Sequence, residues 1–265
     1  MRGVWYRRLR AASYRALGSW LLLAAALPAS AEPATVRVAV AANFRAVLES
    51  LARDYEAVNE RVRIDLISGS TGKLYAQIVA GAPFDLFLAA DQARPERLLA
   101  TGRAVAGTRH TYAIGRLVLW DPRRADGVGP DRLQAGDFRR LALAKPALAP
   151  YGAAAQAVLR DLGLEDSLRD RLVFGENVAQ TFAFVRSGNA GLGFVALSQL
   201  RALPPSVIGS YWEPDLNDRF AIRQDMVLLQ RAEGRKVPSE FYSFLRSNRA
   251  RAVIESAGYR VSPNR

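Results

Sequence analysis

Short apolar runs alternate with amphipathic segments along most of the chain. The first three runs, rich in valine, leucine and alanine, are residues 36–42, 62–68 and 84–90. Apolar side chains at helical spacing follow the first of them: Phe44, Val47, Leu48, Leu51 and Tyr55. Three further runs are residues 141–144, 171–174 and 192–197. Runs of this length are typical of buried parallel strands, and their alternation with helices predicts an α/β fold with mostly parallel sheets.

Two longer extended stretches, residues 111–120 and 220–229, interrupt this alternation. They predict two strands that cross between two lobes, each lobe being a mostly parallel sheet flanked by helices. The expected division is residues 32–115 and 226–265 for the first lobe and residues 116–225 for the second. Ligand sites in open α/β sheets lie beyond the carboxyl ends of the strands. We therefore expect a site in a cleft between the lobes.

The first 31 residues differ in composition from the rest. They carry five arginines and no acidic residue, and they include an apolar run over residues 17–27. The small residues Ala29, Ser30 and Ala31 precede Glu32. This order predicts a secretory signal peptide that is cleaved before Glu32. A membrane span needs about 20 apolar residues, so an uncleaved anchor is the less favoured alternative, and the mature protein is expected to be soluble in the periplasm.

The basic charge is spread over the chain. The formal net charge is +12, and it falls to about +7 without the five arginines of the predicted signal peptide. Acidic residues separate the basic ones, and no run of five like charges occurs. The pattern indicates solubility and a weak general attraction for anions. It argues against a nucleic-acid partner.

Several kinds of chemistry lack the residues that they need. The chain has no cysteine, which fits an exported protein without disulfides and leaves no thiol nucleophile. His110 is the only histidine, so no histidine-based metal cluster can form. Asp85 and Asp91 are expected to bond a loop and to cap a helix rather than to act as an acid–base pair. An enzyme on this fold is therefore a disfavoured alternative.

The sequence GSTGK at residues 69–73 looks like a nucleotide-binding loop. A Walker loop needs four residues between its first glycine and Gly-Lys, and Ser or Thr after the lysine. Here only Ser70 and Thr71 intervene, and Leu74 follows Lys73. What remains is a strand end, two hydroxyl side chains and a helix start, which either only caps the helix or also holds an anion. Lys73 is expected to point along the helix to solvent.

Four predicted junctions between a strand and a helix carry polar groups of this kind. They contain Asn43, the loop 69–73, Tyr151 and the pair Asn177 and Val178. Free main-chain N–H groups and the helix dipole make a helix start favourable to an anion. Two junctions fall in each predicted lobe, so together they predict a cleft that holds a small oxyanion by neutral donors. Asn43 is expected at a helix N-cap.

Six stretches of the sequence together resemble the periplasmic molybdate-binding proteins of ABC transporters: VAVAANF, ISGSTGKLYAQIVAGAPFDLFLAADQ, HTYAIGRLVLW, APYG, ENVAQ and GLGFVALSQ. The likeness covers nearly all of the mature chain in order, and GAPFDLFLAAD is its most specific part. It implies a type II, two-lobed periplasmic binding protein that closes on molybdate or tungstate and uses no cofactor. It also implies a monomer that delivers its ligand to the membrane permease of an ABC transporter.

The resemblance further implies which residues bind the oxyanion. They are Asn43, Ser70, Thr71, Tyr151 and Val178, the last through its main-chain N–H. Two positions depart from the family pattern: Ala42 replaces a threonine of one branch, and Ala196 replaces a tyrosine of another. The exact number of donors therefore stays open. The alternatives are a receptor for another tetrahedral oxyanion such as sulfate, or a periplasmic sensor that feeds no transporter.

Overall fold

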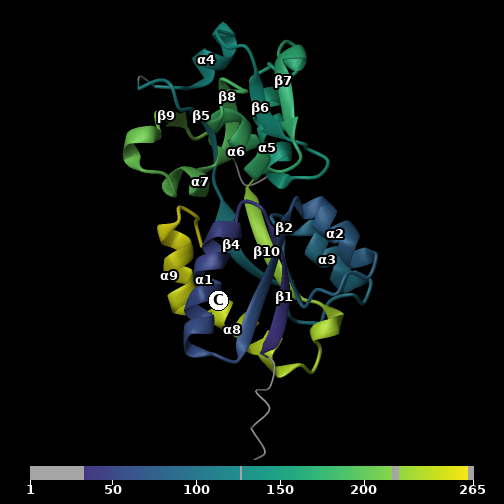
Figure 1. Ribbon diagram of the computed structural model, residues 1–265. Coiled ribbons are helices and arrows are strands. Elements are labelled where there is room, and N and C mark those ends of the chain that lie inside the picture. Colours follow the sequence, from purple (N-terminus) through teal and green to yellow (C-terminus); the bar gives the residue numbers. More distant parts are fainter. Residues whose placement is uncertain (1–32, 126, 217–220, 262–265) are drawn as a thin grey trace, which may run out of the picture. The chain divides into compact units, whose positions relative to one another are not determined.

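The computed structural model describes residues 33–125, 127–216 and 221–261, which belong to one compact unit (Figure 1). The predicted signal peptide lies outside the described residues. Two five-stranded sheets with helices on their faces make up the unit. The expected α/β architecture is confirmed, whereas the exact lobe boundaries stay a prediction.

The first sheet has the strand order β2-β1-β3-β10-β4. Its strands are β1 (Ala34–Ala41), β2 (Val62–Gly69), β3 (Leu86–Leu88), β4 (His110–Gly115) and β10 (Ile222–Leu228). β1 runs parallel to β2 and β3, and β10 runs antiparallel to both of its neighbours. Val36, Val38 and Val40 of β1 are fully buried. A strand buried on both faces reads as a continuous apolar run, which is why the sequence pattern located β1.

The second sheet has the order β7-β6-β8-β5-β9. Its strands are β5 (Leu117–Asp121), β6 (Leu141–Ala144), β7 (Leu172–Gly175), β8 (Leu192–Ala196) and β9 (Ser210–Trp212). β6 runs parallel to β7 and β8, and β5 runs antiparallel to β8 and β9. The sequence reading missed β9, because three residues are too few to show a period.

The chain crosses from the first sheet to the second at Arg116, between β4 and β5. Residues 111–120, expected as one crossing strand, are therefore two strands that belong to different sheets. The chain returns to the first sheet between β9 and β10. β10 pairs with β3 and β4, so it lies wholly in the first sheet.

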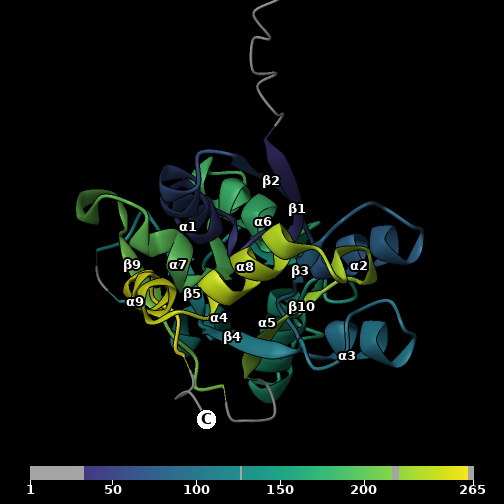
Figure 2. The same cartoon turned by 90° about the horizontal axis from the view of Figure 1, so that it is seen from below.

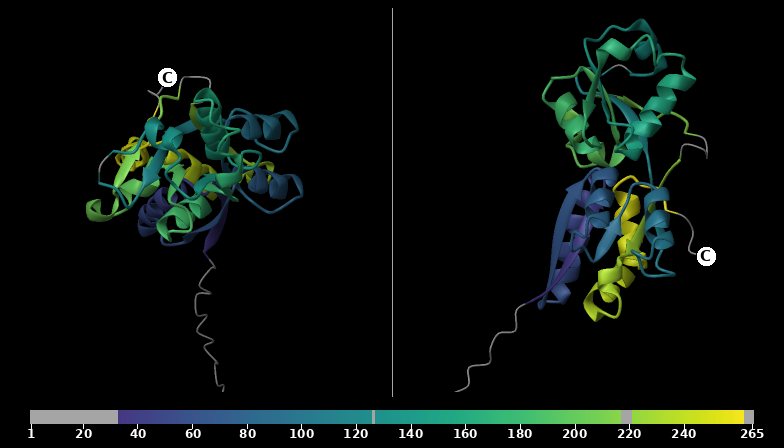
Figure 3. Two further views of the ribbon diagram at one scale, coloured as in Figure 1. Left: turned by 90° about the horizontal axis from the view of Figure 1, so that it is seen from above. Right: turned by 90° about the vertical axis from the view of Figure 1, so that its right-hand side faces the viewer.

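Helices cover both faces of each sheet (Figures 1 and 2). With the first sheet are α1 (Arg45–Val58), α2 (Thr71–Val79), α3 (Ala93–Ala100), η3 (Gln230–Ala232), α8 (Lys236–Leu245) and α9 (Asn248–Ser256). With the second are α4 (Pro130–Ala135), α5 (Pro150–Asp161), η1 (Arg169–Arg171), α6 (Val178–Arg186), α7 (Leu197–Arg201) and η2 (Pro205–Val207). The C-terminal helices α8 and α9 lie beside α1, as Figure 3 also shows.

Each sheet has one apolar cluster on each face. In the first sheet, Phe44, Leu48 and Phe241 pack on the side of α1 and α8, and Leu74, Phe87 and Leu98 pack on the side of α2 and α3. In the second sheet, the ring of Trp120 stacks on Phe182 with centroids 5.0 Å apart. Trp120 thus belongs to the core, and the partly buried Phe182 packs against it.

Asp85, the acidic residue in the GAPFDLF stretch, is fully buried before β3. Its Oδ2 accepts the main-chain N–H of Arg37 at 2.9 Å, and its Oδ1 accepts Arg231 Nε at 3.1 Å and also contacts Arg235. A buried carboxylate needs such partners. Asp85 thereby joins β1 to the segment that follows β10, which is the structural role expected for it.

Candidate functional site

The predicted site residues lie around one small cavity between the two sheets. Its lining contains all five of them together with neighbouring residues of the same loops: Ala41, Ala42, Asn43, Gly69, Ser70, Thr71, Ala90, Ala149, Pro150, Tyr151, Asn177 and Val178. Three loops come from the first sheet and two from the second. The arrangement has the form predicted from the four junctions.

Asn43 follows β1, but it does not cap α1. The N-cap position is Phe44, and no side chain caps this helix. The Asn43 amide instead donates to Gln224 Oε1 at 2.8 Å and to Tyr259 Oη at 3.1 Å. Both amide protons are thereby used inside the protein. The expected N-cap role of Asn43 is wrong, and the donor that remains at this position is its main-chain N–H.

Ser70 and Thr71 start helix α2 at the end of β2. Ser70 Oγ caps the helix by accepting the main-chain N–H of Lys73 at 3.4 Å. Thr71 Oγ1 accepts the main-chain N–H of Ala90 at 3.1 Å. Each hydroxyl acts there as an acceptor, so its own proton stays free to donate. A capping role and anion binding are thus compatible at the same loop.

The two junctions of the second sheet are the starts of α5 and α6. Pro150 is the first residue of α5, which fixes a helical backbone without requiring an N–H. Asn177 caps α6, its Oδ1 accepting the N–H groups of Ala179 and Gln180, each at 3.0 Å. Val178 is the first residue of α6. Its N–H therefore lies outside both the cap and the helix ladder.

Four main-chain donors around the cavity lack a partner. None of the hydrogen bonds among the described residues uses the main-chain N–H of Asn43, Thr71, Tyr151 or Val178. Two of these groups come from each sheet. Ala42 adds no fifth donor, because its N–H donates to Gly69 O at 3.0 Å. Unpaired N–H groups at helix starts attract an oxyanion.

The cavity carries no charged side chain among its lining residues. Burial raises the pKa of Tyr151 well above its usual 10. The same cause raises the pKa of Tyr112 well above 10 and the pKa of Tyr259 to about 12. All three phenols are therefore neutral at any physiological pH, and the site consists of neutral donors.

Two charged groups stand close to these loops. Lys73 is about half exposed, and its Nζ lies 2.5 Å from Glu176 Oε2, the residue before Asn177. The expectation that Lys73 points along the helix to solvent is therefore wrong: it pairs with a residue of the second sheet. The pair neutralises a carboxylate that would otherwise repel an anion at Val178.

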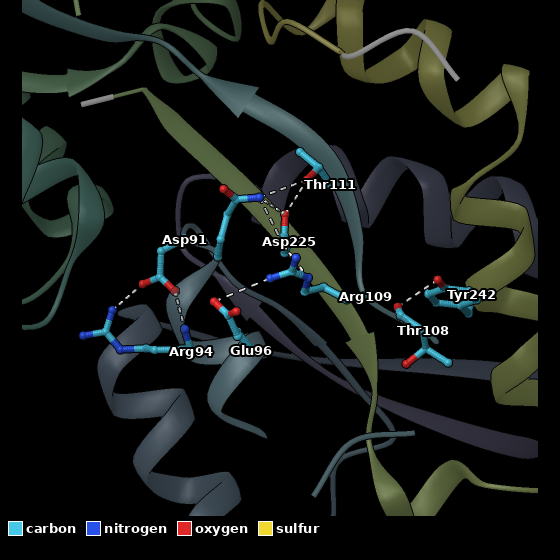
Figure 4. A network of polar contacts seen from close by, with 9 residues as sticks. Asp91, Arg94, Glu96, Thr108, Arg109, Thr111, Asp225 and Tyr242 are labelled. Carbon is cyan, nitrogen blue, oxygen red and sulfur yellow. Dashed lines mark hydrogen bonds and ion pairs between the residues drawn. The ribbon is translucent and has the colours of Figure 1, made fainter. Parts of the chain in front are cut away.

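A polar network around Asp225 of β10, shown in Figure 4, holds the loop after β3. Asp225 is buried, and its Oδ1 accepts Thr111 Oγ1 at 2.6 Å and Gln92 Nε2 at 3.1 Å. Asp91 Oδ1 accepts the main-chain N–H of Arg94 in the first turn of α3 at 3.0 Å, although the N-cap position itself is Gln92 and not Asp91. These contacts fix the loop that contributes Ala90 to the cavity.

A larger groove of about 520 Å³ adjoins the cavity and shares Ala90 and Pro150 with it. Its lining includes three arginines, Arg94, Arg160 and Arg223, and one carboxylate, Asp91, which pairs with Arg94, so the arginines are in excess. The positive charge therefore lies beside the cavity rather than in it. Such a surface attracts anions at long range without fixing their geometry.

The sequence reading missed three residues that support the site. Gln224 and Tyr259 hold the Asn43 side chain, and Tyr112 donates to Gln224 Oε1 at 3.0 Å. None of them belongs to a junction between a strand and a helix, so no local pattern marks them. Ala196, noted as a departure from the family, is fully buried at the end of β8 and does not line the cavity.

Two absences hold for the part of the chain that the structure describes. No group of three or more histidine, aspartate or glutamate side chains is placed to hold a metal ion. No helix there is long and apolar enough to cross a membrane.

Comparisons with known proteins identify the family. The family model for bacterial extracellular solute-binding proteins matches residues 36–260. The molybdate-binding protein ModA of Azotobacter vinelandii is 42% identical, over 92% of this chain and 95% of that protein. ModA of Rhodobacter capsulatus is 37% identical, over 90% of this chain and 92% of that protein.

A solved structure agrees with these matches. The periplasmic molybdate-binding protein of A. vinelandii matches with a TM-score of 0.80 and 37% identity, over 86% of this chain and 100% of that one. The resemblance seen in the sequence is thus confirmed by family model, relatives and structure. The chain belongs to the family of bacterial extracellular solute-binding proteins, and it is a binding protein rather than an enzyme.

Proposed function

We propose that this protein binds molybdate, or the similar dianion tungstate, and delivers it to the membrane permease of an ABC transporter. The observation that carries the proposal is that the four residues with unpaired main-chain N–H groups, two from each sheet, all line one cavity without charged side chains. The names of the two most similar relatives reported above support molybdate as the ligand. Molybdate is then a transported ligand, not a cofactor.

The proposed donors follow from the contacts around the cavity. Asn43, Thr71, Tyr151 and Val178 donate through their main-chain N–H groups, and Ser70 and Thr71 add their hydroxyl protons. The Asn43 side chain positions its own backbone through Gln224 and Tyr259. Every group in the set is a donor, so the set suits an oxyanion that carries no proton.

A receptor for another tetrahedral oxyanion, such as sulfate, is the second candidate. Neutral N–H donors also suit sulfate, so the cavity chemistry alone does not separate the two. The relatives named for molybdate favour the first candidate. The two anions differ in size, because the bonds to oxygen are shorter in sulfate than in molybdate.

We further propose that the mature protein begins at Glu32 and acts as a monomer in the periplasm. The basic, acid-free start and the small residues before Glu32 support cleavage there. The intact mass of protein isolated from the periplasm is expected to lack the first 31 residues. Recovery of the full-length chain in the membrane fraction would contradict this processing.

Selectivity tests the ligand assignment. Donors fixed on two sheets match one size of tetrahedron, because packed interiors deform reluctantly. Sulfate would leave about two donors unpaired at about 1–3 kcal/mol each, so molybdate and tungstate are expected to bind about a hundredfold more tightly. Calorimetric titration with molybdate, tungstate, sulfate and phosphate measures this. Equal affinity for sulfate would favour the second candidate.

The hydroxyl of Thr71 is expected to matter for affinity. Removing it in Thr71→Ala should weaken molybdate binding by about 1.5–3 kcal/mol, the range for a hydrogen bond to a charged group. Thr71→Ser keeps the hydroxyl and is the matched control, with affinity close to that of the wild type. Thermal unfolding of the unliganded variants checks that both are folded. An unchanged Kd for Thr71→Ala would remove Thr71 from the donor set.

Molybdate affinity is expected to stay flat between about pH 6.5 and 8.5. The raised pKa of Tyr151 keeps this phenol protonated across the window. Burial, followed by the charge of Arg246, lowers the pKa of His110 below its usual 6.5, so this imidazole is mainly neutral across the window. Titrations across the window at constant ionic strength measure the effect. A tenfold change, about 1.4 kcal/mol, would reveal an ionisable group coupled to the site.

A further inference from the structure

The hydroxyl of Tyr151 lies against β4 and β10, the two strands of the first sheet that adjoin the segments connecting the two sheets. Gly115 is the last residue of β4, one residue before the crossing at Arg116. A Cβ atom added at Gly115 would fall well inside contact distance of Tyr151 Oη, 2.9 Å from Tyr151 Cζ and 2.6 Å from Gln224 Nε2. Only glycine leaves room for this hydroxyl here.

Gln224 on β10 supplies the hydrogen-bond partner of the Tyr151 hydroxyl. Its Nε2 donates to Tyr151 Oη at 3.5 Å, and its Oε1 accepts Asn43 Nδ2 at 2.8 Å and Tyr112 Oη at 3.0 Å. The side chain is fully buried. Two donors on Oε1 fix the orientation of the amide, so Nε2 must face Tyr151.

These contacts join opposite sides of the cleft. Tyr151 belongs to α5, which packs in the apolar cluster of the second sheet. Gly115, Gln224 and Asn43 belong to the first sheet or to the turn that follows β1. Movement of the second sheet relative to the first would therefore separate Tyr151 from Gly115 and Gln224. The Tyr151 phenol would then leave a buried position that exists only in the closed arrangement.

We propose that Gly115 and Gln224 form a seat for the Tyr151 hydroxyl that stabilises the closed cleft, and that both are positioning residues for anion binding although neither lines the cavity. The proposal rests on the proposed function. Apparent affinity scales with the fraction of molecules in the binding-competent state. The seat raises that fraction, and it aligns the Asn43 and Tyr151 main-chain donors at the same time.

The steric half of the seat is tested by Gly115→Ala. The added methyl group should block Tyr151 from the closed position while the open form folds normally. Molybdate affinity is expected to fall by at least about tenfold, through a smaller closed fraction. Gly129→Ala is the matched control, because a Cβ there meets no atom within 4 Å and the φ of −160° is ordinary extended backbone. Equal affinity of the wild type and Gly115→Ala would overturn the proposal.

A rescue distinguishes the seat from a general structural effect. Tyr151→Phe removes the hydroxyl and keeps the main-chain N–H. In the wild-type background it should weaken binding by about two- to fivefold, the size of one modest hydrogen bond. In the Gly115→Ala background the same change removes the closest of the three clashes and leaves the shorter-than-normal contacts with Tyr151 Cζ and Gln224 Nε2, so binding should become tighter but stay weaker than in the wild type. Loss of affinity in both backgrounds would contradict the seat.

Closure can also be measured without any anion, which separates this proposal from the proposed function. Lys73 and Glu176 touch across the cleft, and the chain has no cysteine, so Lys73→Cys with Glu176→Cys gives a clean pair for a short bis-maleimide. Cross-linking accumulates whenever the cleft closes. Gly115→Ala should slow it at least about threefold relative to Gly129→Ala, by lowering the closed population. An equal rate would overturn the seat, whichever anion the wild type binds.

Should Gly115→Ala fail to fold, Tyr151→Phe takes its place in the cross-linking experiment. Loss of the hydroxyl should then slow cross-linking by about two- to fivefold. An unchanged rate for this variant would equally overturn the proposal. A wild type that binds none of the four oxyanions in calorimetry would count against the proposed function alone.

Discussion

The site depends on one constraint, which is that a helix cannot satisfy the N–H groups of its own first turn. Parallel strands end at one edge of a sheet, so the helices that follow them begin at that edge too. Here α2 follows β2, and α6 follows β7. The caps on Ser70 and Asn177 satisfy N–H groups deeper in each first turn. They leave the N–H of Thr71 and of Val178 for a ligand.

Neutral donors have a different effect from charged ones. A guanidinium attracts any anion from a distance. A main-chain N–H, by contrast, binds only an acceptor that lies within hydrogen-bond distance and along the N–H direction. The three arginines near the site line the adjoining groove, and the cavity itself has no charged lining. In the proposed function, long-range attraction and recognition of the anion therefore belong to different surfaces. The geometry of the cavity then decides which anion is held.

The sequence allowed the fold to be predicted where the physics is local. Strands buried on both faces gave apolar runs, and all four junctions of the site were found because caps and helix starts have residue preferences. The errors made at the site concern contacts between residues that are distant in the sequence. The bonds of Asn43 to Gln224 and Tyr259 span 181 and 216 residues. Lys73 meets Glu176 only because two separate sheets face each other, and no periodicity contains that information.

Two glycines also have roles that the sequence alone does not reveal. Gly72 and Gly115 look in the sequence like ordinary loop or strand residues. In the structure the N–H of Gly72 donates to Leu148 O at 2.9 Å, and a Cβ at Gly72 would lie 3.1 Å from that oxygen. Gly115 makes room for Tyr151. Both are places where the two sides of the cleft approach each other, and close approach explains the absence of a side chain.

Several of the contacts that join the two sides of the cleft among the described residues are single polar contacts, which leaves a ligand room to influence closure. They include Gly72 with Leu148, Arg94 with Ala147 O at 3.2 Å, Lys73 with Glu176, and Ser198 with Tyr259 at 3.0 Å. The apolar clusters of the two sheets are largely separate, with Ala41, Ala90 and Ile222 joining that of the second sheet. Half-exposed ion pairs and single hydrogen bonds contribute only about 0–1.5 kcal/mol each. An oxyanion that engages donors on both sides, as proposed, would add several charge-assisted bonds at once, and these would add to the free energy with which the proposed Tyr151 seat favours the closed cleft.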